Sequence, residues 1–283
     1  MSLKSIREQG LDKFYTNPEY ALKCIKHTEE LYSLDTFDYV IEPSAGNGSF
    51  YNIINHENKI GLDIKPEHSD IIEKDFFEFE PDRKYKNVLT IGNPPFGRVS
   101  SLAIKFFNKA AKFSNVIAFI IPRTFRKDSI KNKLDTQFHL IFDEETPTSP
   151  CVFTPKMSVK CCFQIWVKKE ERREIIKLPT THSDWEFLKL GPKDNNNQPT
   201  PPKGADFAIR AYGGKIGEIK KENLMDLRPK SYHWVKSNIP IDILIHRFEM
   251  LDFSKSTDTA RQNSTGKAEL VQLYLTHINI ESE

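Results

Sequence analysis

The chain has 283 residues, 38% hydrophobic and 28% charged, which suffices for one large domain or for one medium and one small domain. The formal net charge is only +2, which excludes a surface that is basic throughout, so any nucleic-acid surface must be local. The longest apolar run, 116–121, is too short to span a bilayer, and the polar start lacks an apolar export segment, so we expect a soluble, cytoplasmic protein.

Helical and strand signals alternate between residues 18 and 167. Pro18 begins a stretch with apolar residues at helical spacing. Further helix-like stretches lie at 49–56, 100–113 and 128–135, and apolar runs typical of strands lie at 39–41, 59–62, 88–91, 116–121, 139–142 and 159–167. This alternation predicts an α/β fold with a mainly parallel sheet covered by helices on both faces.

The composition changes after Lys168. A charged run is followed by an Asn-, Pro- and Gly-rich segment, 191–204, which is typical of a loop or linker. Residues 206–235 then read as short strands and turns, and helices are expected at 241–251 and 266–278. We therefore predict a larger domain over residues 1–168 and a smaller C-terminal region over residues 169–283.

A loop of small residues, Glu42–Phe50 (EPSAGNGSF), directly follows the first strand-like run. A strand, a glycine-containing loop and a helix form a nucleotide-binding arrangement, and Gly46 and Gly48 would let the backbone approach a ligand closely. The spacing is not G-x-G-x-x-G, so a tight strand–helix turn without a ligand explains the loop equally well on its own.

Two carboxylates follow at the ends of the next runs. Asp63 ends the second strand-like run, where an acidic residue can accept hydrogen bonds from ribose hydroxyls. Asp75 ends a third short run and could accept from an adenine amino group, with Phe76 against the ring. Each alone is more often a surface carboxylate, but their order after the glycine loop favours a nucleoside site.

The motif Asn93–Phe96 (NPPF) comes at the end of the run 88–92. Two prolines fix the backbone and remove two N–H donors. The Asn93 side chain and the Pro94 carbonyl then offer two acceptors to an –NH₂ group conjugated with a ring. Accepting both hydrogens draws the nitrogen lone pair out of conjugation, and Phe96 offers a flat face for the base. The alternative without chemistry is a rigid turn with an aromatic cover.

In this order, EPSAGNGSF, GLDI, KDFF and NPPF resemble the motifs of amino-group methyltransferases that use S-adenosyl-L-methionine. The resemblance covers roughly residues 12–168. The run 12–16 (DKFYT) resembles that family's N-terminal cofactor segment, and its place before the other motifs resembles the gamma order of DNA N6-adenine methyltransferases. The resemblance implies a Rossmann-like seven-stranded sheet whose antiparallel last strand lies within 159–168, with IIPRTF bordering the target pocket.

The resemblance also implies roles for individual residues. It places catalysis on Asn93, Pro94, Pro95 and Phe96, and it places Phe153 similarly to an aromatic that packs on a flipped base. It assigns cofactor binding to Phe14, Tyr15, Thr16, Glu42, Pro43, Ala45, Gly46, Gly48, Asp63, Ile64, Asp75 and Phe76. No metal is expected, because neither the eight histidines nor the four cysteines are spaced as ligands. We interpret the cysteines as free, buried thiols.

Residues 203–236 contain eight basic and four acidic residues, with aromatic residues interleaved. Basic and aromatic residues on short loops suit phosphate contact and base stacking, although a small solvated domain is the plain alternative. We expect nucleic-acid contacts from Arg210, Tyr212, Lys215 and Lys230.

These features favour a site-specific DNA N6-adenine methyltransferase that acts on a flipped-out adenine in duplex DNA, free-standing or in a restriction–modification system. Methylation of RNA at adenine N6 or guanine N2 stays open, because NPPF-type loops serve both. Protein glutamine methylation and a binding subunit without turnover are the further alternatives. The short region before Glu42 and the basic C-terminal segment argue against the former, and the intact motifs argue against the latter.

Overall fold

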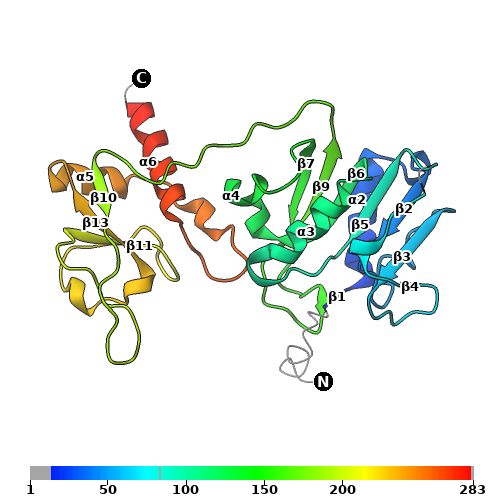
Figure 1. The fold of residues 1–283 in the computed structure, drawn as a ribbon, viewed down its shortest axis with the longest axis horizontal. Helices are drawn as coiled ribbons and strands as arrows, with labels where there is room; N and C mark the ends of the chain where they lie inside the picture. The colour runs from blue at the N-terminus through cyan, green and yellow to red at the C-terminus, as the bar shows by residue number, and fades with distance from the viewer. Residues whose placement is uncertain (1–13, 83, 282–283) are drawn as a thin grey trace. The chain divides into compact units, whose positions relative to one another are not determined.

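The computed structural model describes residues 14–82 and 84–281, with side chains described through residue 278 (Figure 1). The chain forms two compact units, Met1–Ile175 and Ile176–Glu283. The change in composition at Lys168 precedes the boundary because the next residues stay bound to the first unit. The Lys169 N–H donates to the Gln137 carbonyl at 2.8 Å, and the Arg173 N–H donates to the Thr136 carbonyl at 2.8 Å.

The first unit contains a seven-stranded sheet. Its order is β4 (Ile72–Glu73), β3 (Lys59–Asp63), β2 (Tyr39–Glu42), β5 (Val88–Gly92), β6 (Val116–Pro122), β9 (Cys161–Lys168) and β7 (Phe138–Glu145). The neighbours from β4 to β6 pair in parallel, whereas β9 is antiparallel to both β6 and β7. The prediction of a Rossmann-like α/β sheet with an antiparallel last strand is confirmed.

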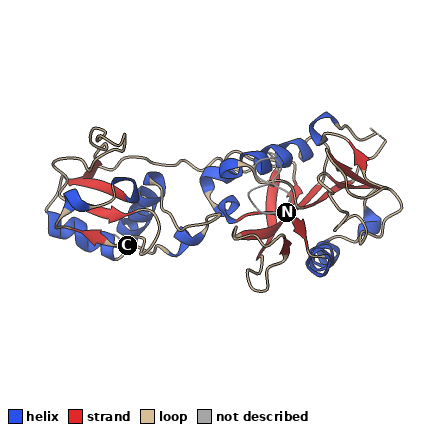
Figure 2. Ribbon diagram, turned by 90° about the horizontal axis from the view of Figure 1, so that it is seen from below, coloured by secondary structure: helices blue, strands red, loops and turns tan. Residues whose placement is uncertain are grey.

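Helices cover both faces of this sheet (Figure 2). Alternate residues of each central strand point to opposite sides, so Ile120 belongs to the same core as α2 (Pro18–Leu31) and Ile121 to the same core as α3 (Ser101–Ala110). Asn17 caps α2, since its side-chain oxygen accepts the Glu19 N–H at 2.9 Å. The two faces of the sheet thus belong to two separate apolar cores.

Two expected helices are shorter or absent. Residues 49–53 form turns and 54–56 have no regular structure, so no helix forms there, and the stretch at 128–135 contains only α4 (Asp128–Lys131). The Lys59 ammonium donates to the carbonyls of Tyr51 and Ile54 at 2.8 and 2.7 Å, which satisfies them outside a helix. The short segments η1 (Leu34–Thr36), η2 (Phe76–Glu78), η3 (Arg98–Ser100) and η4 (Arg123–Arg126) complete the helical turns of this unit.

The second unit has its own four-stranded antiparallel sheet, ordered β10 (Trp185–Phe187), β13 (Tyr232–Ser237), β11 (Phe207–Arg210) and β12 (Ile219–Lys220). The helices α5 (Ile241–Glu249) and α6 (Lys267–Glu281) share a core with Trp185, Phe207 and Val235. The short segments η5 (Leu224–Asp226), η6 (Pro229–Ser231) and η7 (Ser254–Thr257) connect these elements. Within residues 14–82 and 84–281, no helix is both long and apolar enough to cross a membrane.

Candidate functional site

The carboxyl ends of parallel strands β2, β3 and β5 meet at one edge of the larger sheet. Glu42 and Asp63 end β2 and β3, and Asn93 directly follows β5. In open α/β sheets this edge is where ligands bind. Three of the predicted motifs are therefore adjacent, although they are separated in the sequence.

Asp63 is bound to the glycine loop. Its Oδ2 accepts the Gly46 N–H at 2.9 Å, and its Oδ1 accepts the Lys65 N–H at 2.8 Å. Gly46 lies at φ 53° and Gly48 at φ 84°, a region that favours glycine. Each oxygen of an ionised carboxylate can accept about two hydrogen bonds, so both Asp63 oxygens keep capacity for a further donor. Ile64, the next residue, is 56% exposed.

The N-terminal segment lies against this loop. β1 (Tyr15–Thr16) pairs with β8 (Phe153–Thr154), and a β-carbon at Gly46 would come within 2.8 Å of the Tyr15 ring. The Tyr15 hydroxyl donates to Glu67 Oε1 at 2.6 Å, while the Glu67 N–H donates to the Gly46 carbonyl at 2.9 Å. Burial, with the hydrogen bond to Glu67, raises the pKa of Tyr15, so the phenol stays a donor. No motif in the sequence pointed to Glu67.

Asn93 contacts the same segment. Its amide nitrogen donates to the Phe14 carbonyl at 3.2 Å, and because a carbonyl only accepts, this bond fixes which end of the amide is which. The Asn93 Oδ1 and the Pro94 carbonyl accept no hydrogen bond within residues 14–82 and 84–278. Both acceptors that the motif predicts thus lack a hydrogen-bond donor in the described part of the chain. Asp12 and Lys13 of the same motif lie outside the described residues.

The backbone after NPPF turns sharply. The Phe96 carbonyl accepts the N–H groups of Leu102 and Ala103 at 3.2 and 3.3 Å, which fixes the motif to the start of α3. The half-buried Phe96 ring packs against both cores of the sheet. Val99 is 76% exposed and lies at φ 52°, which is unusual for a β-branched residue.

Glu42 is a buried carboxyl with an unused oxygen. It is 3% exposed, and its Oε2 makes no hydrogen bond in the described part of the chain. Burial raises the pKa of Glu42 well above its usual range, although the backbone N–H groups of Tyr51 and Phe50 donate to the carboxyl. A β-carbon at Gly92 would lie 3.2 Å from the Glu42 Cγ, so the two strand ends are close-packed.

Three of the predicted residues have structural contacts of their own within the first unit. The Phe76 ring is 1% exposed and stacks on Phe106 at 5.3 Å, so the ring turned toward solvent at this position is Phe77, 37% exposed. Asp75 Oδ1 accepts the Phe77 N–H at 2.8 Å and so caps η2. Phe153 is buried at 4% exposure in the core that contains α2. Phe153 lies in the two-residue strand β8, which is too short for an alternating pattern to indicate which side chain faces inward.

The remaining cofactor candidates line the same edge. Pro43 and Ala45, within the glycine loop, are buried. Thr16 is 4% exposed and its hydroxyl has no partner among the described residues. Cys24, Cys161 and Cys162 are buried free thiols, and Cys151 is half-buried. No group of three potential metal ligands occurs within the described residues.

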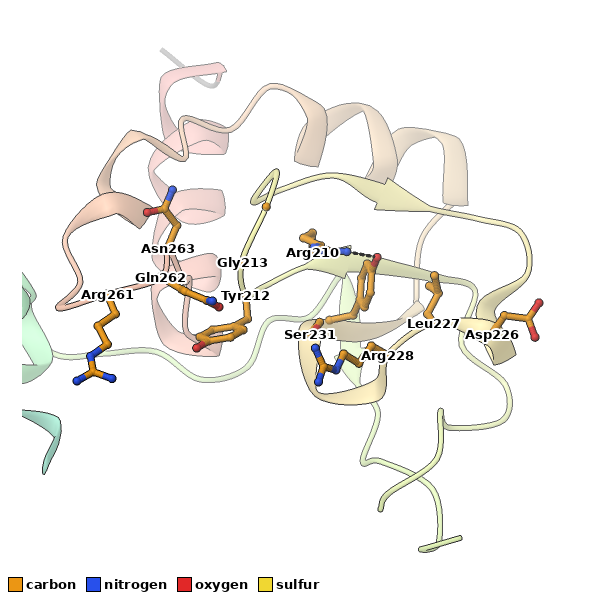
Figure 3. Close-up of a pocket in the computed structure, with 12 residues that line it drawn as sticks. Arg210, Tyr212, Gly213, Asp226, Leu227, Arg228, Ser231, Arg261, Gln262 and Asn263 are labelled. Atoms are coloured by element: carbon orange, nitrogen blue, oxygen red, sulfur yellow. Dashed lines mark hydrogen bonds between the residues drawn. The ribbon is translucent and has the colours of Figure 1, made fainter. Parts of the chain in front are cut away.

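The C-terminal candidates separate into two pairs. Arg210 and Tyr212 line one pocket of the second unit, together with Arg228, Arg261 and others that the sequence analysis did not single out (Figure 3). Lys215 and Lys230 do not line it, and the Lys230 ammonium donates to Gln198 Oε1 at 3.3 Å. Arg228 lies in the basic segment, but Arg261 lies well beyond it, so only the fold brings the two arginines together.

No protein-family model matches the chain, and no curated protein matches it. The 23S rRNA methyltransferase ErmE is a similar solved structure, with TM-score 0.42 and 14% identity over 56% of this chain and 71% of its own. PH1948 of Pyrococcus horikoshii, provisionally assigned as an RNA methyltransferase, matches with TM-score 0.41 and 17% identity over 56% of this chain and 87% of its own. Protein 1320 of Thermoplasma acidophilum matches with TM-score 0.40 and 16% identity over 55% of this chain and 88% of its own. At these TM-scores, the fold assignment depends on the strand order given above.

Proposed function

We propose that this chain transfers the methyl group of S-adenosyl-L-methionine to an exocyclic amino nitrogen of a nucleic-acid base, with adenine N6 in DNA as the leading substrate. The observation that carries the proposal is the orientation of Asn93. Its amide nitrogen donates to the Phe14 carbonyl, and its oxygen, like the Pro94 carbonyl, accepts no hydrogen bond from the described residues.

The residues at the strand ends fit the proposed cofactor. Asp63 retains acceptor capacity for two ribose hydroxyls, and the exposed Ile64 offers an apolar contact for a purine. The unpartnered Glu42 Oε2 is a buried polar atom that lacks a donor, as expected where a ligand supplies one. When bound, S-adenosyl-L-methionine supplies an activated methyl electrophile, so the protein needs no covalent nucleophile.

The chain's own contribution is to bind and orient the amino group. Asn93 Oδ1 and the Pro94 carbonyl would each accept one N–H hydrogen, which localises the nitrogen lone pair and directs it along one line. These acceptors are prepared in advance, because the Phe14 carbonyl and two proline rings hold them. The partly exposed Phe96 ring gives the base a surface to stack on.

The residues at the carboxyl ends of β2, β3 and β5 do not discriminate between DNA and RNA. The order of the motifs favours a DNA adenine, which must leave the stack to reach Asn93. RNA methylation at adenine N6 or guanine N2 is the second candidate. An exposed tyrosine in the second unit favours it, in a pocket with two arginines whose side chains have no partner among the described residues, because such surfaces suit single strands.

The proposal is tested by labelled methyl transfer to DNA, RNA and protein in parallel, followed by nucleoside analysis. Label should appear in N6-methyladenine. Asn93→Ala should bind the cofactor in calorimetry like the wild type but lose turnover by at least about 10²–10³-fold, because its oxygen acts mainly in the transition state. The matched control Asn195→Ala, in an exposed loop, should retain activity. Full activity of Asn93→Ala would exclude NPPF as the catalytic loop.

A further inference from the structure

The second unit contains a pocket of about 640 Å³ that lies wholly within residues 176–283. Figure 3 shows its walls, which come from the end of β11, the turn around Arg228 and the loop 261–263. The pocket is within the size range of small-ligand sites, and it is too small for a double helix.

The pocket is strongly cationic. Arg210, Arg228 and Arg261 line it, whereas Asp226 is its one carboxylate. Arg228 and Arg261 are exposed, and neither side chain forms an ion pair or hydrogen bond within the described residues. Guanidinium groups that no protein carboxylate neutralises suit an anionic ligand, and their planar fork matches a phosphate.

Arg210 is held in place rather than free. Its Nη1 donates to the Tyr232 hydroxyl at 2.7 Å, and its guanidinium lies 5.2 Å from the Tyr232 ring centre. A β-carbon at Gly214 would lie 3.4 Å from its Nη2, so the glycine leaves room for this side chain. The pocket thus contains one guanidinium held by Tyr232 and two exposed ones without a side-chain partner among the described residues.

An exposed aromatic ring stands beside these cations. Tyr212 is 48% exposed, although its backbone is fixed by a bridge to Ser264 and by its N–H donating to the Ser231 carbonyl at 3.2 Å. A rigid, solvent-facing ring costs little entropy when a base stacks on it. Gln262, next to Arg261, offers a donor and an acceptor to a base edge.

We propose that this pocket binds one unpaired nucleotide of the substrate strand, its phosphates on Arg228 and Arg261 and its base on Tyr212. This inference rests on the proposed function for its ligand class. In a duplex the neighbouring bases cover both faces of each base, so only an unstacked base can use the Tyr212 ring. The enzyme therefore holds two nucleotides outside the stack, one at Asn93 and one in the second unit.

The test measures binding of fluorescein-labelled 12-nucleotide single strands, DNA and RNA, and of the matching duplexes by anisotropy on the full chain. Single strands should bind more tightly than duplexes. R228A/R261A should weaken single-strand binding at least about 10-fold and reduce the salt slope by about 1.4, because two phosphate contacts are lost. The control K189A/K193A removes the same charge from exposed positions outside the pocket and should change binding by less than about 3-fold.

The ring is tested separately. Tyr212→Ala should weaken single-strand binding about 5- to 100-fold, and Tyr212→Phe should restore it. The proposal is overturned if Tyr212→Phe binds as poorly as Tyr212→Ala, if duplex binds as well as single strand, or if a poly-glutamate peptide of equal charge competes as well as the oligonucleotide. Circular dichroism melts of each variant establish that it folds.

This result is independent of methyl transfer. If the pocket variants lose single-strand binding but no base is methylated, the pocket stands and the proposed activity fails. If methyl transfer occurs and the pocket variants bind like the control, the activity stands and the pocket proposal fails.

Discussion

Asp63 both shapes the glycine loop and offers acceptors at the strand edge. Its two oxygens already accept the N–H groups of Gly46 and Lys65. Removing the carboxylate therefore breaks the hydrogen bonds that hold the loop as well as those offered to a ligand. A single side chain thus couples the conformation of the loop to binding. The two effects can be separated because an amide retains one of the two oxygens.

Asp63→Ala should weaken S-adenosyl-L-methionine binding by about 1–3 kcal/mol, because the ribose hydroxyls lose their acceptors. Asp63→Asn should lose less affinity for S-adenosyl-L-methionine than Asp63→Ala and should keep more thermal stability. Isothermal titration calorimetry and thermal unfolding of both variants check this, with the exposed Asp70→Ala as the control. Unchanged affinity in Asp63→Ala would remove this residue from the cofactor site.

Glu42 makes stability depend on pH. Its pKa is raised by burial in the folded protein, so between the unfolded value and the raised value the folded state binds more protons than the unfolded state. Stability is therefore greatest when the carboxyl is protonated and falls as the pH rises through this interval. Glu42→Gln, which cannot ionise, should escape this loss.

The unfolding midpoint of Glu42→Gln minus that of the wild type should consequently be more positive at pH 8 than at pH 5. Thermal unfolding at both pH values measures it. Glu73→Gln, an exposed carboxyl on β4, is the control and should show a smaller pH effect. A difference that is the same at both pH values would show that burial does not govern the titration of Glu42.

At the scale of elements, the link from NPPF to α3 is a strained turn. Val99 and Ser100 both lie at positive φ, 52° and 59°, and the Ser100 hydroxyl is 2.7 Å from the Thr124 hydroxyl beside the end of β6. Such backbone costs roughly 1–2 kcal/mol for a residue with a side chain, and it occurs most often at functional sites. The turn therefore lowers the stability of the fold while it positions Phe96.

Val99→Gly should relieve this cost, so its unfolding free energy should equal or exceed that of the wild type. Ile175→Gly is the matched control, an exposed β-branched residue without positive φ, and should lose about 0.5–1 kcal/mol. Urea unfolding, followed on the transition of the first unit, compares the two. Equal losses would mean that the turn is not strained.

At the scale of the whole molecule, each unit has its own apolar core. A ligand stabilises only the part that it binds, so S-adenosyl-L-methionine at 100 times its Kd should stabilise the first unit by about 2.7 kcal/mol and leave the second unchanged. The three tryptophans allow this to be read, because Trp166 lies in the first unit and Trp185 and Trp234 in the second.

Thermal unfolding of Trp166→Phe, followed by fluorescence, reports the second unit alone. Its midpoint should not move with the cofactor, while the calorimetric transition of the first unit should rise. A single-stranded oligonucleotide should raise the fluorescence midpoint instead. A shift of both transitions by the cofactor alone would mean that the two units unfold together.

The sequence was enough to predict the alternation of strands and helices, and hence the α/β sheet, because apolar periodicity reports which faces are buried. It also determined the order of the motifs at the strand ends, since consecutive parallel strands place their carboxyl ends at one edge. The two prolines of NPPF restrict the backbone by their own covalent geometry, so the loss of two N–H donors from this loop follows from the residue types themselves.

Contacts between distant segments, by contrast, come from the tertiary structure. Asn93 is oriented by Phe14, 79 residues away, and the pocket of the second unit is lined by both Arg228 and Arg261. The tertiary structure also decided that Phe76 is buried while Phe77 is partly exposed, and that residues 49–53 form turns. The physical reason is common to all four. Local propensity and spacing constrain neighbours in the chain, whereas these outcomes depend on which side chains and carbonyls fill space contributed by other elements.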